Sequence, residues 1–232
     1  MHAPFLTTYP PLISNTGMKI GALTALTSAV MDQENVDFPD GRLNAESWTM
    51  ILFNLLFLGP FVYSCMNPFL TAKKHIVKTF CDIFNLVAVH SAVYALIHRC
   101  MHKIVAFRPI HKAHHQYKNV VLPSNANAVS ANEFLFAYML PFVTGCILIR
   151  PTSFALMSAT LIVSGFNLVI HSNLATKFKW PWFLVTPSDH LEHHEFKTQT
   201  YSAPTFSWRK IFDALHQSCK KCNISCKQCK KC

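Results

Sequence analysis

The sequence predicts an all-α protein, an integral membrane helical bundle whose transmembrane helices form two helical hairpins. Three observations lead to this prediction. Hydrophobic residues make up 51% of the 232 residues and charged residues only 14%, a mixture that is unusual for a soluble chain. Four apolar runs of sixteen to nineteen residues lie between residues 48 and 170. Only Arg150 and Pro151 separate the last two runs, so these two are expected to fold back on each other.

The basic residues indicate a membrane rather than a nucleic acid as the partner. The formal net charge is +10, but Lys and Arg do not form a compact patch interleaved with aromatic residues. They collect beside the apolar runs and at the C-terminus, which fits the anionic headgroups of a lipid bilayer. We therefore expect no nucleic acid among the partners.

Residues 1–46 form a lead-in to the first spanning helix. Their apolar part, Gly21 to Met31, is too short to cross about 30 Å of hydrocarbon, and we expect it to lie at the membrane interface. The first spanning helix is predicted from Trp48 to Met66, nineteen residues without a charge. That length is close to the roughly 20 residues that a crossing needs. Pro60 is expected to kink this helix.

The next apolar run, Phe80 to Ile97, contains Asp82 and His90, so at least one side of this helix should face protein rather than lipid. We interpret His90 as a hydrogen-bonded core residue. A capping box, formed by Ser130 and Glu133, indicates the start of the third helix. The apolar runs 134–149 and 152–170 then form a hairpin that enters the membrane and returns.

Nine of the thirteen histidines lie in short clusters just outside these runs. The clusters are His98 with His102; His111, His114 and His115; His171 alone; and His190, His193 and His194. Offsets of three or four residues place side chains on one face of a helix. Because the hairpin returns the chain to its starting side, all nine imidazoles can meet there. The simplest interpretation of His2, His75 and His216 is that they are surface residues.

The distribution of basic residues predicts which side of the membrane carries these histidines. Ten of the twenty-one Lys and Arg follow His171, and five more lie between Arg99 and Lys118. By the positive-inside rule this side is cytoplasmic. The three lysines between the first two runs argue mildly against that orientation, but the larger count favours it.

Nine histidines suit a pair of metal ions. Imidazole binds borderline metals such as iron, zinc, copper and nickel, and a single zinc ion takes only three or four ligands. We therefore predict that a helical, histidine-rich di-metal site caps the bundle on its cytoplasmic side. Asp189, four residues before His193, and Asn167 are expected to orient imidazoles without binding metal themselves.

The histidine motifs also follow an order that is typical of one family. HRCMH, HKAHH, the apolar hairpin, HSN and DHLEHH together resemble the fatty acid hydroxylase superfamily, which includes sterol desaturases, sterol methyl oxidases and sphingolipid hydroxylases. The resemblance runs from about Asn85 to Phe212, over half the chain, and beyond the last motif it includes Tyr201 and Trp208.

The resemblance implies a membrane-bound di-iron oxygenase with the nine histidines as ligands of two iron ions (Fe2+/Fe3+). Such an enzyme uses O2 and two electrons to hydroxylate or desaturate a lipid, here a sterol or a long-chain acyl or sphingoid lipid, with a weak preference for a sterol. An external carrier, a cytochrome b-type or ferredoxin-like protein, would supply the electrons, and a eukaryotic member would lie in the endoplasmic reticulum. An acidic carrier could meet Arg99, Lys103, Arg108 and Lys112, although these side chains could equally well snorkel to lipid headgroups.

Four positions depart from the residues that are usual in the family. Ser91 stands where an Asp commonly precedes the first motif by seven residues, and Thr200 replaces an Asn. Arg209 and Asp213 replace an Asp and a Gly. None of these positions is a histidine, so they bear on the surroundings of the metals and on the substrate end.

The predicted domains are a lead-in (1–46), a fatty acid hydroxylase-like domain (47–217) and a tail rich in Cys and Lys (218–232). Only three residues separate the two C-x-x-C pairs of the tail, far fewer than in a zinc ribbon. A thiolate cluster, lipidation of a basic tail and disorder near the membrane are all open, and we favour disorder.

Two other functions compete with the oxygenase. The chain could be a membrane metal-binding or transport protein, with histidines as a store and cysteines as a delivery arm. It could also be a catalytically silent relative that acts as the partner of a lipid enzyme.

Overall fold

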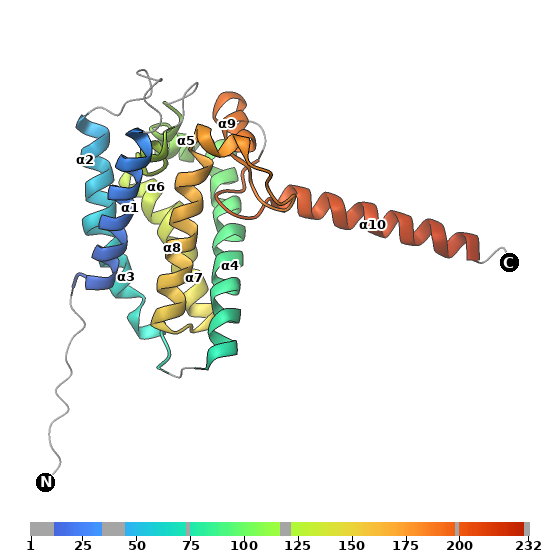
Figure 1. Cartoon of the computed structure of the whole chain (residues 1–232), viewed down its shortest axis with the longest axis horizontal. Coiled ribbons are helices and arrows are strands. Elements are labelled where there is room, and N and C mark those ends of the chain that lie inside the picture. The colour runs from blue at the N-terminus through green and yellow to red at the C-terminus, as the bar shows by residue number, and fades with distance from the viewer. Residues whose placement is uncertain (1–11, 34–44, 73–74, 117–121, 198–199, 230–232) are drawn as a thin grey trace, which may run out of the picture.

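A computed structural model describes residues 12–33, 45–72, 75–116, 122–197 and 200–229, with side chains described as far as Ser218 except that of Leu174. The helices stand side by side in a bundle, from which one C-terminal helix projects (Figure 1). Four helical segments are long and apolar enough to cross a membrane: Ala45–Phe69, Ile76–Lys103, Ala131–Ile149 and Ser153–Ile170. Within the described part of the chain the regular elements are all helical, apart from one isolated β-bridge between Leu184 and Phe206. The predicted all-α membrane bundle is confirmed.

A π-helical turn interrupts the first span. α2 (Ala45–Phe53) passes through η2 (Asn54–Leu58) into α3 (Gly59–Cys65), and the amide of Gly59 donates to the carbonyl of Asn54, five residues earlier. The wide turn comes directly before Pro60, whose ring would clash with a carbonyl four residues back in a regular α-helix. The irregularity expected at Pro60 therefore takes the form of a π-helical turn. A short 3-10 turn, η3 (Asn67–Phe69), ends the segment.

The third and fourth spans form the hairpin. The third consists of α6 (Ala131–Glu133), the π-helical η7 (Phe134–Met139) and α7 (Leu140–Ile149). Arg150 ends it in the left-handed conformation, with φ 50°, and Thr152 caps α8 (Ser153–Ile170) by accepting a hydrogen bond from the amide of Ala155. Both arms pack against α4 (Ile76–Lys103), the second span.

The lead-in contributes a helix to the bundle, so the expected interfacial position was wrong. α1 (Asn15–Gln33) runs alongside α3 and α8 (Figure 1). Its buried face consists mostly of small residues: Gly17, Gly21, Thr24 and Ser28 beside Ile20. Small side chains let two helix backbones approach closely, and this allows α1 to pack although its apolar part is short.

The chain also remains helical where disorder was favoured. α10 extends from Trp208 to Cys229 and leaves the side of the bundle near α9 (Figure 1). No Gly or Pro interrupts residues 208–229, and apolar residues recur at helical spacing in its first turns, at Trp208, Ile211 and Leu215. Cys232 lies outside the described residues.

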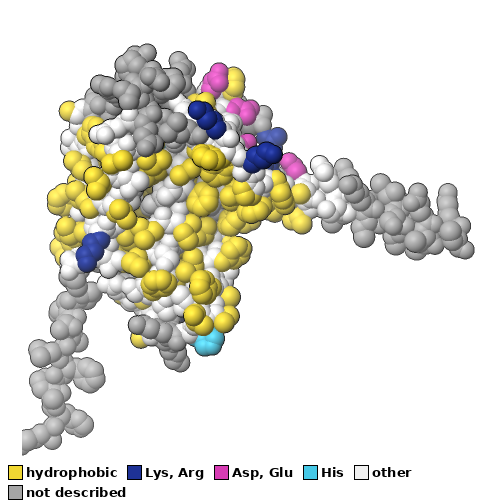
Figure 2. Space-filling model, viewed as in Figure 1, with side chains coloured by type: hydrophobic (Ala, Val, Ile, Leu, Met, Phe, Trp, Pro, Cys, Tyr) yellow, Lys and Arg dark blue, Asp and Glu magenta, His cyan; other side chains and the backbone are white. Residues whose placement is uncertain are grey.

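Large apolar side chains cover much of the outer surface of the bundle (Figure 2). Phe57, Phe80, Phe84, Leu96 and Leu148 are each at least half exposed. Large exposed apolar surfaces mark contacts with lipid or with another protein, which agrees with the membrane assignment. One end of the bundle is instead covered by short segments: η4 (Val105–Phe107), α5 (Arg108–His111), η5 (His114–Gln116), η6 (Pro123–Asn127), η8 (Asn173–Lys177) and α9 (Pro187–Phe196).

Candidate metal centre

All nine histidines predicted as ligands converge beneath these short segments. They come from the end of α4, from α5 and η5, from the residue that ends α8, and from α9. Eight of the nine are at most 4% exposed, and His102 is partly buried. The fold therefore keeps eight of these polar rings out of contact with water, whereas histidines on a protein surface would be exposed.

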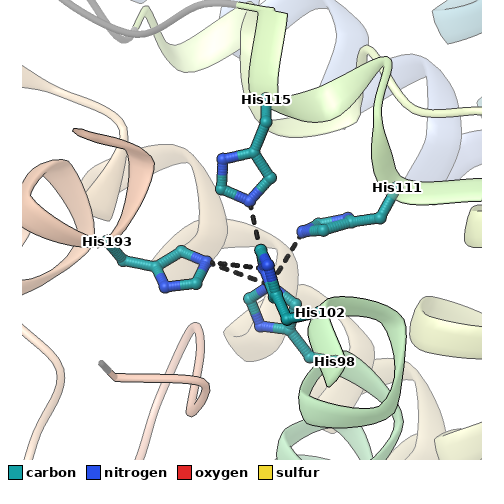
Figure 3. Close-up of side chains that lie close together, drawn as sticks. All are labelled: His98, His102, His111, His115 and His193. Carbon is teal, nitrogen blue, oxygen red and sulfur yellow. Dashed lines mark hydrogen bonds between the residues drawn. The ribbon is translucent and has the colours of Figure 1, made fainter. Parts of the chain in front are cut away.

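Five imidazoles form a first group: His98, His102, His111, His115 and His193 (Figure 3). One ring nitrogen from each lies within 4.8 Å of the others. Nε2 of His98 lies 2.8 Å from Nε2 of His111, and Nε2 of His102 lies 3.2 Å from that of His115. A neutral imidazole has one N–H and one nitrogen with a free lone pair. Five converging ring nitrogens therefore cannot all pair with one another through hydrogen bonds. Lone pairs that meet at one point are what a metal ion requires.

Four further imidazoles form a second group: His114, His171, His190 and His194. Nε2 of His190 lies 2.9 Å from that of His171 and 3.1 Å from that of His194. The two groups are neighbours, because the ring centroids of His115 and His194 are 4.7 Å apart. Two metal ions held in these groups would therefore be close together.

Each H-x-x-H-H motif contributes to both groups. In the motif that begins at His111, the first and last histidines enter the first group and His114 enters the second. In the motif on α9 the pair His190 and His194 enters the second group, while His193 enters the first. On α9, His190 and His194 are four residues apart and share a helix face, whereas His193 is rotated by about 100° from His194. His111 ends α5, and His114 and His115 lie in the separate turn η5, so a shared helix face does not explain the division in that motif.

Three rings are oriented by acceptors at their other nitrogen. Nδ1 of His98 lies 2.9 Å from the carbonyl oxygen of Tyr201, and Nδ1 of His171 lies 2.7 Å from that of Asn167. Nδ1 of His111 lies 2.6 Å from a carboxylate oxygen of Glu133. Since each acceptor requires a hydrogen on Nδ1, Nε2 is left with a free lone pair that faces its group.

Burial keeps the rings of the short segments neutral. It is the main cause that lowers the pKa of His114, His115 and His190 far below the ordinary 6.5, and it lowers the pKa of His171 to about 4. Neighbouring imidazoles lower the first three pKa values further, because each added positive charge would repel the next. At neutral pH these nitrogens can bind a metal without first releasing a proton.

The two residues expected to orient imidazoles differ in what they do. Asn167 contacts His171, but through its backbone carbonyl, while its side-chain amide donates to the carbonyl of Ala126 at 3.3 Å. Asp189 completes a capping box with Thr186 and accepts from Nζ of Lys210 at 2.6 Å. Its carboxylate therefore fixes α9 in place instead of bonding to His193, the partner that the spacing suggested. Burial alone would raise the pKa of Asp189, but the bonds from Lys210 and Thr186 lower it overall.

Sequence reasoning missed Glu133 as a residue of the site. Ser130 caps the helix as predicted, because its hydroxyl oxygen accepts from the Glu133 amide, but the Glu133 carboxylate does not complete a capping box. The same side chain is completely buried and reaches His111. A carboxylate at the start of an apolar run was the available signal, since a buried acid in a membrane protein needs a partner.

His90 belongs to neither group, as expected, but the interpretation as a hydrogen-bonded core residue was wrong. It is 1% exposed, and neither ring nitrogen has a hydrogen-bond partner among the described residues.

The four residues that depart from the family pattern have the following conformations and contacts. Thr200 has φ 54°, a left-handed conformation that Asn adopts more readily than a β-branched residue. Arg209 and Asp213 face each other on α10, with Nε and a carboxylate oxygen 3.8 Å apart. The hydroxyl of Ser91 donates to the carbonyl of Phe206 at 3.4 Å.

Comparison with known proteins decides the family. Residues 83–218 match the model of the family described as fatty acid hydroxylase. The chain belongs to the fatty acid hydroxylase family. Neither a curated protein nor a solved structure shows a significant match to it.

The matched segment of this fatty acid hydroxylase contains all nine histidines, Glu133 and the hairpin. Membership indicates an oxygenase that acts on a lipid, and the family typically depends on metal. The residues fit such a requirement: two buried groups of neutral nitrogen donors, several of them held by a second hydrogen bond, form a donor set for borderline metals.

A depression on the surface of the hydroxylase leads to the first group. His102, His111 and His115 lie at its base, and its other polar side chains are Arg108, Lys112 and Lys197. Arg108 is held by a hydrogen bond from its Nε to the carbonyl of His102, at 3.2 Å. Of the predicted basic residues, Arg108 and Lys112 therefore lie beside the candidate centre, together with Lys197, which the sequence did not single out.

Proposed function

We propose that this fatty acid hydroxylase is a membrane-bound di-iron enzyme that hydroxylates or desaturates a lipid with O2 and two electrons. The observation that carries the proposal is the pair of buried histidine groups, which offer five and four nitrogens to two neighbouring points. The proposed ligands are the nine residues His98, His102, His111, His114, His115, His171, His190, His193 and His194. Neutral nitrogen ligands suit iron and leave its charge undiminished.

When bound, two iron ions supply the activation of O2 and the attack on an unactivated C–H bond. The protein holds and orients the ligands. Glu133 and the carbonyls of Tyr201 and Asn167 keep a hydrogen on Nδ1 of their histidines, so that Nε2 is available as a ligand. Burial of eight of the nine rings keeps bulk water away from the reacting carbon.

The electrons enter, in this proposal, from an external cytochrome b-type or ferredoxin-like protein. Arg108, Lys112 and Lys197 surround the depression above the first group, where they would attract an acidic partner. The excess of Lys and Arg on this side supports a cytoplasmic position, and in a eukaryotic cell the endoplasmic reticulum. Residues 47–217 would form the catalytic domain, with 1–46 as its lead-in and 218–232 as its tail.

Metal analysis of the purified full chain, combined with lipid analysis of cells that do or do not express it, tests this function. Two tightly held irons per chain and a lipid product that requires O2 are expected. His114→Ala and His193→Ala should abolish the product while the protein stays in the membrane. Exchangeable zinc or copper without oxidation would instead indicate metal storage or transport. Iron without turnover of any lipid would indicate a silent relative.

A further inference from the structure

The C-terminal helix α10 has one apolar face and one basic face. Trp208, Phe212 and Leu215 follow one another at intervals of four and three residues, so they share one side of the helix. The same alternation continues in the sequence with Cys219, Cys222, Cys226 and Cys229. The charged residues of the helix occupy positions between these: Arg209, Lys210, Asp213, Lys220, Lys221 and Lys227. A basic amphipathic helix of this kind is typical of segments that lie on an anionic membrane surface.

Among the described residues, the apolar face of α10 remains exposed. Phe212 is 61% exposed and Leu215 is 58% exposed, while Trp208 at the start of the helix is partly buried. Side chains of this size gain free energy when they are removed from water, so neighbouring exposed ones mark a surface that binds a partner.

The chain reaches α10 by running along the second span towards the middle of the membrane. The carbonyl of Tyr201 lies 2.9 Å from Nδ1 of His98, and the carbonyl of Phe206 accepts from the hydroxyl of Ser91 at 3.4 Å. Seven residues separate Ser91 from His98 on α4, a rise of about 10 Å. α10 therefore begins about 10 Å nearer to the middle of the span than the histidines at the end of α4.

A series of aromatic rings connects the outer surface of α4 with α10. The ring centroid of Phe206 lies 6.0 Å from that of Phe84 and 6.0 Å from that of Trp208, which in turn lies 6.1 Å from that of Phe212. Phe84 is 62% exposed on a membrane-spanning helix. The apolar face of α10 is therefore continuous with a surface that faces lipid.

An ion pair fixes the direction in which the two faces of α10 point. Nζ of Lys210 lies 2.6 Å from a carboxylate oxygen of Asp189 on α9. At 100° per residue, Trp208 and Leu215 lie about 160° and 140° around the helix from Lys210. Because the side that carries Lys210 faces α9, the apolar side faces away from α9.

The course of α10 agrees with a position along the membrane surface. α10 runs crosswise to the spanning helices and leaves the bundle below α9 (Figure 1). Charged side chains gather at the end of the bundle that carries α9, whereas hydrophobic ones cover the side of the bundle below the start of α10 (Figure 2). A helix that leaves a membrane bundle crosswise, with its apolar side turned away from the charged end, follows the surface of the bilayer.

We propose that α10 lies on an anionic lipid surface, with Trp208, Phe212 and Leu215 among the acyl chains and the basic residues among the headgroups. The excess of Lys and Arg favours this partner over a second copy of the helix, because two copies would repel each other. The ion pair between Lys210 and Asp189 then links the membrane surface to α9, the helix that carries three of the proposed ligands.

Photo-cross-linking tests which side of α10 contacts lipid. The full chain is placed in vesicles of phosphatidylcholine and phosphatidylserine with a trace of phosphatidylcholine that carries tritiated acyl chains. Benzoylphenylalanine, which reacts with nearby C–H bonds under light, replaces Leu215 in one variant and Gln217 in another. Gln217 is the matched control, because it is exposed and lies about 160° around the helix from Leu215. The Leu215 variant should take up several times more tritium.

Three results would overturn the proposal. Equal labelling at the two positions would show that the faces do not differ in their contact with lipid. Labelling at neither position would show that α10 projects into water. A cross-linked dimer in place of a lipid adduct at Leu215 would show that a second copy of the chain covers the apolar face.

Two charge variants give a second measurement in the same vesicles. Phe212→Glu places a carboxylate on the apolar face, where lipid would remove its hydration, so α10 should leave the surface and be cut by trypsin several times faster. Gln217→Glu makes the same change of charge on the other face and should leave the rate of cleavage unchanged.

Phosphatidylserine tests the role of the headgroups. Its omission should speed cleavage of the wild type, because fewer anionic headgroups then hold the basic residues. Equal rates in Phe212→Glu and Gln217→Glu, or equal rates of the wild type with and without phosphatidylserine, would overturn the proposal. The measurements need no metal, O2 or electrons, so their outcome does not depend on the proposed oxidation.

Discussion

The carboxylate of Glu133 lies 2.6 Å from Nδ1 of His111, and neither side chain is more than 3% exposed. The contact joins the start of the membrane hairpin to the segment that follows α4. The second carboxylate oxygen of Glu133 has no hydrogen-bond partner within the described part of the chain. A carboxylate that accepts from Nδ1 makes Nε2 of the same ring a stronger ligand, so a residue that binds no metal can set how tightly the first group holds one.

Glu133→Gln should weaken metal binding at the first group by about 10- to 100-fold. The amide oxygen can still accept from His111, but the negative charge that favours the ligand form of the ring is gone. Metal affinity, measured by competition with a chelator, checks the expectation. Glu192→Gln is the control, because Glu192 is exposed although it lies between two of the histidines of α9. Equal losses in the two variants would show that the buried carboxylate has no special role.

His114 and His115 are adjacent in sequence but belong to different groups. His115→Ala should therefore remove metal mainly from the first group and His114→Ala mainly from the second, so that each variant retains about one metal ion when the wild type holds two. Metal analysis gives the stoichiometry, and Mössbauer spectra of iron-loaded protein should show which environment remains. The exposed His216→Ala serves as the control. Loss of the same signal in both variants would contradict the division into two groups.

Sequence patterns predicted the bundle and the meeting of the nine histidines because both follow from one-dimensional signals. Apolar runs of membrane length must be buried in lipid, and the tight link at Arg150 and Pro151 returns the chain to one side. The helical spacing of the histidines on α4 and α9 then brings their ring nitrogens together.

The division between the two groups was not predictable, because it depends on how short segments are rotated relative to one another. His111 ends α5, whereas His114 and His115 lie in a separate 3-10 turn. The packing of α1 was also missed. Its apolar part is short, and the contact depends on two glycines whose effect appears only when a second backbone lies against them.

Gly21→Ala should destabilise the fold by about 1–3 kcal/mol. A Cβ at this position of α1 would lie 1.9 Å from the carbonyl oxygen of Leu55, and a backbone atom cannot move aside as a flexible side chain can. Gly165→Ala is the matched control, because a Cβ there meets no atom within 4 Å. It should be neutral or stabilising by up to about 1 kcal/mol, since Ala favours helix. Thermal unfolding in detergent measures both. Equal stability of the two variants would mean that α1 does not pack against the first span.

The metal-free protein should lose stability as the pH falls below about 6.5. In the unfolded chain each histidine takes up a proton near its ordinary pKa of 6.5, whereas burial holds the pKa of His114 and His190 well below that value in the folded chain. The unfolded state then binds more protons, so the free energy of unfolding decreases by up to about 1.4 kcal/mol per pH unit for each such histidine. The decrease ends only when the pH falls below the folded pKa.

Chemical unfolding of the metal-free chain at several pH values between about 8 and 5 measures this slope. His114→Leu should reduce the slope, because a leucine in the same buried place takes up no proton in either state. A slope that is identical in the wild type and in this variant would show that His114 does not contribute, and stability that increases towards low pH would contradict the burial of neutral rings.

Reversing a charge beside the depression should slow the delivery of electrons. Lys112 is exposed next to the first histidine group, and Lys112→Glu replaces an attraction for an acidic donor by a repulsion. The rate of donor-dependent reduction should fall several-fold at low salt, and the difference should shrink at about 0.5 M salt, where screening is strong over a few ångströms. Metal content should not change, because no proposed ligand is touched. Lys19→Glu provides the same charge change on an exposed residue in the first turns of α1 and should leave the rate unchanged. The N-terminal end of α1 points away from the end of the bundle that carries α9 (Figure 1). If both variants slow reduction equally, net charge rather than a docking surface explains the effect.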